Sequence, residues 1–164
     1  NTAQIASGKA ITPHFLKSID GKPVEFTPTE LFTPKEKAQL PLVRRGMYEV
    51  GNNPDGGTAY KLIHTAVVPL AVKTGTAQVV GISQTTKKRM KEADMDYFHR
   101  SHAWMTSFGP YDKPQYAVTV LVEHGGGGGS AAGPVIMQIY EKLVQMGYID
   151  ANATTVKDTA KKTK

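Results

Sequence analysis

Three stretches between residues 67 and 123 have the apolar pattern of β-strands. Residues 67–80 form an extended run whose apolar ends flank a centre of small and polar residues. A second strand is expected over residues 102–108, where Gly109-Pro110 stops it. In the third stretch, residues 115–123, apolar side chains fall on both faces. We therefore expect the third strand to be central in its sheet and covered on both sides.

Helical patterns come before these strands. Residues 1–8 resemble the last turns of a helix closed by Gly8, which predicts further helical residues upstream of Asn1. Thr33-Pro34-Lys35-Glu36 has the form of a capping box. Pro41 is expected to interrupt that helix and to start another, which ends at Gly51-Asn52. The apolar residues expected on the buried side of this second helix are Leu42, Val43, Met47 and Val50.

The remaining segments are polar or rich in glycine. Residues 83–100 are charged and are expected to form a partly helical insertion. Residues 125–129 are all glycine and could be a flexible linker, but they are too few to separate domains, so a turn is favoured. Pro134 is expected to open the helix that follows. The residues that share the apolar face of this helix are Ile136, Tyr140, Leu143 and Val144.

Composition limits the functional classes. A net charge of +6 is compatible with an acidic ligand, but neither basic run has the interleaved aromatic residues that stack on nucleic acid bases. The chain has no cysteine, which excludes disulfides, thiolate metal sites and a cysteine nucleophile. No apolar run approaches the roughly 18 residues that cross a bilayer. No cofactor or metal is expected.

Lys73-Thr74-Gly75, in the middle of the first strand, is the main candidate for chemistry. The ammonium group of Lys73 supplies positive potential for an acidic substrate. The hydroxyls of Thr74 and Thr76 can bind a carboxylate, and Gly75 lets a ligand lie close to the strand backbone. The N–H of Thr76 can form half of an oxyanion hole. An exposed edge strand with an ordinary lysine would give the same short motif, so the motif alone leaves both interpretations open.

Four segments around this motif carry a resemblance to a known family. They are PLAVKTGTAQVV (residues 69–80), NPDGGTAYK (53–61), HAWMTSFGP (102–110) and EHGGGGGSAAGP (123–134). In this order they resemble the transpeptidase domain of class B penicillin-binding proteins, the elongation type (penicillin-binding protein 2) more than the division type. The similarity covers most of residues 1–149.

The resemblance implies an α/β penicillin-recognising fold, similar to that of the serine β-lactamases, with an antiparallel sheet and helices on its faces. This chain would supply three consecutive strands and the C-terminal helix. The implied activity is that of a periplasmic D,D-transpeptidase, which cross-links peptidoglycan stem peptides during cell elongation and is acylated by β-lactams. The implied partners are a glycan polymerase and a rod-shape scaffold protein, with a membrane anchor outside this chain. The matching family residues are Lys73, Thr74, Gly75 and Thr76.

The chain departs from the family in lacking its nucleophile motif. The family also carries Ser-x-x-Lys and Ser-x-Asn. None of the serines here has lysine three residues later or asparagine two residues later. We therefore expect residues 1–149 to be the C-terminal portion of a transpeptidase domain, inactive alone, and residues 150–164 to be a polar basic tail. The acylated serine would lie upstream in the same polypeptide.

Other interpretations remain open. A D,D-carboxypeptidase or a serine β-lactamase would share Lys-Thr-Gly, and so would a non-catalytic β-lactam sensor. His99 and His102 form a weak metal candidate that straddles an expected helix–strand boundary. Trp104 is expected in the core or in the wall of a cleft, and Asp94 and Asp96 are expected to be solvated.

Overall fold

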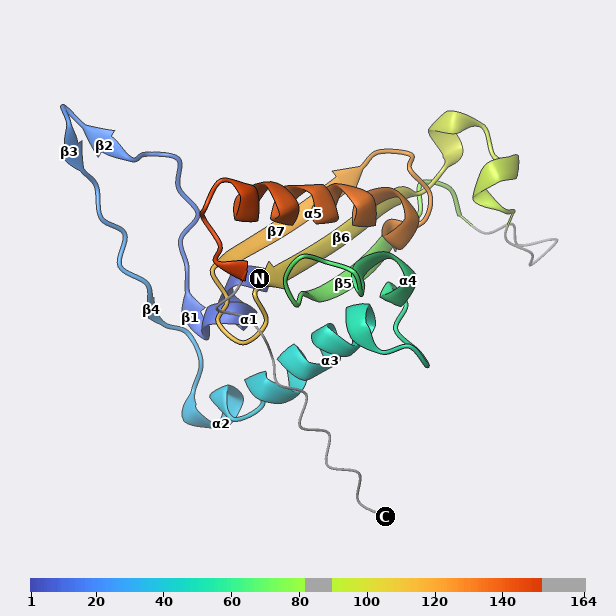
Figure 1. Ribbon diagram of the computed structural model, residues 1–164. Coiled ribbons are helices and arrows are strands. Elements are labelled where there is room, and N and C mark those ends of the chain that lie inside the picture. Colours follow the sequence, from blue (N-terminus) through green and yellow to red (C-terminus); the bar gives the residue numbers. More distant parts are fainter. Residues whose placement is uncertain (82–89, 152–164) are drawn as a thin grey trace, which may run out of the picture.

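The computed structural model of the 164-residue chain describes residues 1–81 and 90–151. Its elements are arranged as an antiparallel sheet between helices (Figure 1). In chain order they are α1 (Thr2–Ser7), β1 (Lys9–Ala10), β2 (Ser18–Ile19), β3 (Lys22–Pro23), β4 (Thr29–Glu30), α2 (Pro34–Lys37), α3 (Leu40–Asn52), α4 (Tyr60–Ile63), β5 (Ala71–Ala77), η1 (Glu92–Asp94), η2 (Tyr97–His99), β6 (His102–Gly109), β7 (Tyr116–Val122) and α5 (Gly128–Gln145).

The largest sheet of the described residues has the order β5-β6-β7, with both pairs antiparallel. α5 lies along one face of this sheet (Figure 1). On that face Ile136 and Tyr140 of α5 are fully buried together with Val72 and Met105. Burying each such side chain contributes about 1.5 to 3 kcal/mol. The expected apolar face of the last helix is confirmed.

The opposite face of the sheet packs on α1 and α3. A smaller cluster there joins Ala6 of α1 and Met47 of α3 to Ala71 and Phe108 of the sheet. α1 ends at Gly8, whose left-handed φ of 74° allows its N–H to reach the carbonyl of Gln4 at 2.7 Å. The expected α/β architecture, with helices on both faces of an antiparallel sheet, is therefore confirmed.

The helix boundaries around residues 33–52 follow the sequence closely. Thr33 and Glu36 make the reciprocal hydrogen bonds of a capping box, and α3 begins beside Pro41 and ends at Asn52. The prediction for the buried side of α3 is partly wrong, because Leu42 and Val43 are 72% and 44% exposed. The residues of α3 that are buried are Leu40, Met47 and Gly51.

Gly51 is the residue through which α3 packs closely against β5. A Cβ at this position would lie 2.9 Å from Ile63 Cγ2 and 3.1 Å from Val72 Cγ2. The helix therefore approaches β5 through a residue without a side chain, and a search for apolar residues cannot find such a contact.

Two strand predictions need correction. The first strand was expected over residues 67–80, but β5 spans only Ala71–Ala77. Val68 and Leu70 are buried in the core before the strand begins, and Val79 and Val80 are exposed after it ends. β7 is not central. It lies at an edge of the sheet within the described residues, with Ala117 and other alternate residues exposed.

The glycine-rich segment is a turn, as favoured, and not a linker. Gly126 and Gly128 are buried, and α5 starts at Gly128. Pro134 therefore lies inside the helix and does not open it. Pro134 lies on the exposed side of α5. Proline has no N–H to donate, so the carbonyl four residues earlier lacks its helical partner and can be solvated instead.

The insertion between β5 and β6 is helical in part, as expected, with η1 and η2 as short turns. Its basic run, residues 87–89, lies outside the described residues, as does most of the 150–164 tail. Ile149 is 2% exposed and belongs to the α5 core. The domain boundary after residue 149 stays a prediction.

Candidate functional site

Lys73, Thr74, Gly75 and Thr76, here called the 73–76 segment, occupy the middle of β5. β5 pairs with β6 on one side and is an edge strand of the sheet within the described residues. Successive side chains of a strand point to opposite faces. Ala71 lies in the cluster with α1 and α3, so Lys73 and Gly75 are on that face of the sheet. Val72 lies in the core beside α5, so Thr74 and Thr76 are on the α5 face.

Lys73 is the cationic group of the segment. Its side chain is exposed, and its ammonium donates a hydrogen bond to the carbonyl of Thr74 at 2.6 Å. The register places it beside Thr106 of β6, whose hydroxyl lies 2.7 Å from that of Thr2 and 2.8 Å from that of Thr119. The face of the sheet that carries Lys73 is thus polar at its centre.

The two threonines lie on the α5 side. Thr74 Oγ1 is 3.4 Å from Thr58 Oγ1, which ties β5 to the loop that precedes α4. Thr76 is exposed. The predicted site residues are therefore adjacent in one strand but do not form one side-chain cluster, since Lys73 projects from the opposite face. Side chains from both faces can meet a ligand only beyond the free edge of β5.

Gly75 is enclosed between β6 and the start of α5. A Cβ on Gly75 would come within 3.3 Å of Trp104 Cβ. A Cβ on Gly128 would lie 2.2 Å from the carbonyl oxygen of Gly75 and 2.4 Å from that of Trp104. Glycine is therefore needed at position 128, because the first turn of α5 lies directly against the backbone of the segment.

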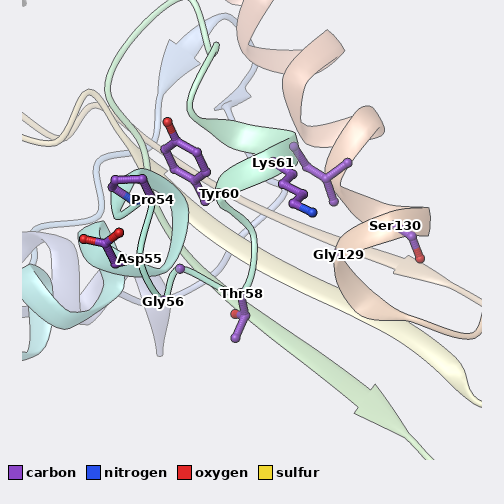
Figure 2. A pocket seen from close by; sticks show the side chains of 10 residues that line it. Pro54, Asp55, Gly56, Thr58, Tyr60, Lys61, Gly129 and Ser130 are labelled. Atoms are coloured by element: carbon purple, nitrogen blue, oxygen red, sulfur yellow. The ribbon is translucent and has the colours of Figure 1, made fainter.

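Figure 2 shows a cavity of the domain, which has a volume of about 640 Å³. Thr58 and Ser130 line it, so it lies between the 54–58 loop, α4 and the first turn of α5. Lys61 and Asp55 are its charged residues. Thr58 also contacts Thr74, so this residue connects the cavity to the 73–76 segment, whose own residues do not line it.

The comparison with protein families decides the identity of this arrangement. The family described as "Penicillin binding protein transpeptidase domain" matches residues 2–141. The chain belongs to this family.

Relatives of the transpeptidase domain agree with that assignment. The chain is 35% identical over 147 residues to "Peptidoglycan D,D-transpeptidase MrdA" of Salmonella typhimurium strain SL1344, covering 86% of this chain and 23% of that protein. It is 40% identical over 104 residues to the protein of that name from Escherichia coli K12, covering 63% of this chain and 16% of that protein. The chain thus spans about a quarter or less of the relatives' length.

Solved structures show the same fold. The penicillin-binding protein PBP2 of Helicobacter pylori, solved in a complex with MreC, aligns with a TM-score of 0.73 at 44% identity, covering 90% of this chain and 24% of that one. Pseudomonas aeruginosa PBP2 in complex with WCK 5153 aligns with a TM-score of 0.67 at 31% identity, covering 98% of this chain and 31% of that one. The penicillin-recognising fold is therefore confirmed, as is the resemblance to the PBP2 type.

Two residues beside the transpeptidase strand were not singled out from the sequence. Gly128 and Thr58 both contact the 73–76 segment from other parts of the chain. Both lie in the segments on which the family resemblance rests, so that resemblance could have pointed to them. Periodicity could not find them, because neither is apolar.

The minor candidates have ordinary positions in this transpeptidase domain. His102 accepts a hydrogen bond from the backbone N–H of His124, and within residues 1–81 and 90–151 no cluster of three metal-ligating side chains occurs. Trp104 is 40% exposed and lies beside Gly75, so it is not in the core, and its place in the wall of a cleft stays a prediction. Asp94 and Asp96 are exposed, as expected. None of the described helices is long and apolar enough to span a membrane.

Proposed function

We propose that this chain forms the substrate-holding side of the active site in a peptidoglycan D,D-transpeptidase of the elongation type. The observation that carries the proposal is the Lys-Thr-Gly-Thr segment on an edge strand within a domain of the transpeptidase family. The names of the MrdA relatives support the activity, and the PBP2 structures support the elongation type.

The proposed chemistry is acyl transfer to a serine outside these residues. The serine oxygen attacks the D-Ala–D-Ala carbonyl, and the N–H of Thr76 donates to the oxyanion as charge develops there. The bond to the terminal D-Ala then breaks, and its nitrogen leaves as an amine after taking a proton. The amine of a second stem peptide attacks the acyl-enzyme, forms the cross-link and releases the serine.

Lys73, Thr74 and Thr76 would hold the terminal carboxylate of the donor peptide. An extended peptide that lies along the free edge of β5 can pair with its backbone, as an added strand does. A carboxylate just beyond that edge is within reach of the Lys73 ammonium from one face and of the threonine hydroxyls from the other. β-Lactams, which carry a carboxylate beside a strained amide, would occupy the same position and acylate the serine.

The same relatives support a proposal for the cellular setting. We place the intact protein in the periplasm, anchored in the inner membrane by a segment outside these residues. The H. pylori relative was solved in a complex with MreC, and a scaffold of that kind is the partner we propose, together with a glycan polymerase.

The test is acylation of the intact protein by a fluorescent penicillin. Replacing Lys73 with alanine removes a charge-assisted hydrogen bond to the carboxylate, so the second-order acylation rate constant should fall about 10- to 100-fold. Lys142→Ala, which removes the same charge from the exposed side of α5, should leave that constant unchanged. Equal acylation of the K73A variant and the wild type would contradict the proposed role of Lys73.

A further inference from the structure

Glu92 of η1 makes a bidentate contact with the residue that leads into β6. One carboxylate oxygen accepts the backbone N–H of Ser101 at 2.8 Å, and the other accepts the Ser101 hydroxyl at 2.8 Å. Ser101 is only 3% exposed. Hydrogen bonds to a charged acceptor are about twice as strong as neutral ones, so this contact holds η1 firmly against the start of β6.

Ser101 in turn holds the glycine turn that precedes α5. Its carbonyl accepts the N–H of Gly126 at 2.8 Å. Glu92 also touches this turn directly, since a Cβ on Gly126 would come within 3.3 Å of Glu92 Cβ. Beside this contact, the N–H of His124 donates to His102 Nδ1 at 3.0 Å. The turn is thus held by a hydrogen bond to Ser101 and by a contact with Glu92, and His124 just before it is bonded to His102, the first residue of β6.

Gly128, two residues beyond Gly126, lies against the carbonyl of Gly75. That carbonyl and the N–H of Thr76 belong to one peptide unit, which is planar. Whatever fixes the orientation of the Gly75 carbonyl therefore also fixes the direction of the Thr76 N–H. The first turn of α5 presses on this peptide plane from the side opposite to Trp104 Cβ.

We propose that Glu92 is a positioning residue, which acts through Ser101, Gly126 and Gly128 to aim the Thr76 N–H at the oxyanion. The inference rests on the proposed function, in which that N–H is an oxyanion donor. Glu92 itself does not touch the substrate. Loss of its carboxylate frees the glycine turn and lets the Gly75–Thr76 peptide plane tilt, while the carboxylate-binding side chains of Lys73 and Thr74 stay in place.

The experiment measures acylation of the intact protein by a fluorescent penicillin over a range of concentrations, which separates the maximal acylation rate from the half-saturating concentration. Removing an oxyanion donor outright costs about 100- to 1,000-fold, so misdirecting one in Glu92→Ala should lower the maximal rate about tenfold. The half-saturating concentration should stay within about twofold, because binding of the carboxylate is intact.

Two variants complete the design. Glu92→Gln can still accept from the Ser101 N–H and donate to its hydroxyl, so it should restore the rate to within about threefold of wild type. Asp94→Asn removes the same charge from the same short helix at an exposed position and should behave as wild type.

Four results would contradict parts of these proposals, and each can be told from the others. A wild-type protein that is not acylated at all would overturn the proposed function. An acylated wild type with an equally fast E92A variant would overturn the role of Glu92 alone. An E92A variant with a lower melting temperature and equally impaired binding and acylation would make Glu92 a structural residue, and so would a failure of Glu92→Gln to restore the rate.

Discussion

Tyr140 is a residue whose ionisation is coupled to folding. Its side chain is fully buried, its hydroxyl donates to the carbonyl of Tyr116 at 3.2 Å, and Ser107 Oγ donates to it at 3.4 Å. Burial raises the pKa of Tyr140 from 10.0 to about 12, although the hydrogen bond from Ser107 works in the opposite direction.

The raised pKa predicts a loss of stability in alkali. Above pH 10 the unfolded chain releases the phenolic proton, and the folded chain keeps it until about pH 12. The stability contribution is therefore fully present below pH 10 and is lost as the pH rises through this window. In urea unfolding, wild type should lose about 1 to 2 kcal/mol relative to Tyr140→Phe between pH 10 and 12. Parallel pH dependence of the two proteins would contradict this prediction.

At the residue scale, the chemical roles of residues 73–76 stay predictions, and the structure tests only where these residues lie. Lys73 and Thr76 could be singled out because their side-chain types and spacing carry the chemical signal. Their projection from opposite faces of β5 also follows from strand alternation, but the contacts of Thr74 with Thr58 and of Gly75 with Gly128 do not. Such contacts join positions far apart in the chain, and neither period nor composition encodes them.

At the scale of elements, the close approach of α5 to β5 gives the sharpest test. Gly128→Ala would place a Cβ 2.2 Å from the carbonyl of Gly75, so the helix must move away from the strand. We expect a loss of about 1 to 3 kcal/mol in the free energy of unfolding, together with slower acylation.

The matched control for this substitution is Gly46→Ala in α3. Gly46 is exposed, and nothing lies within 4 Å of an added Cβ there. The higher helix propensity of alanine should stabilise this variant by up to about 1 kcal/mol. If the Gly128→Ala variant were as stable and as reactive as the Gly46→Ala variant, the strand–helix contact would not constrain the segment.

Element types were predicted well because the relevant patterns are local. The capping box of α2 lies within four consecutive residues, and the strand breaker Pro110 directly follows Gly109, the last residue of β6. Two of the wrong predictions, those for α3 and β7, concern which faces are covered. β7 has apolar residues on both faces, yet within the described residues it is an edge strand and alternate residues are exposed. Which elements pair with a strand and which cover its faces depends on distant parts of the chain.

At the scale of the whole molecule, we propose that the chain holds one side of an active site. It spans 23% of the Salmonella relative, and it lacks the serine motifs of its family. The domain family and the fold were both accessible from the sequence through the resemblance. The alternative of a β-lactamase predicts rapid turnover of penicillin by the intact protein, whereas a transpeptidase should remain acylated.

The most direct test of the account is to find where the intact protein is acylated. The protein is labelled with a penicillin and digested, and the adduct is located by mass spectrometry. The account predicts one adduct, on a serine in a Ser-x-x-Lys motif outside these 164 residues, and none on this chain. An adduct on any serine of this chain would contradict the assignment of residues 73–76 to substrate holding alone.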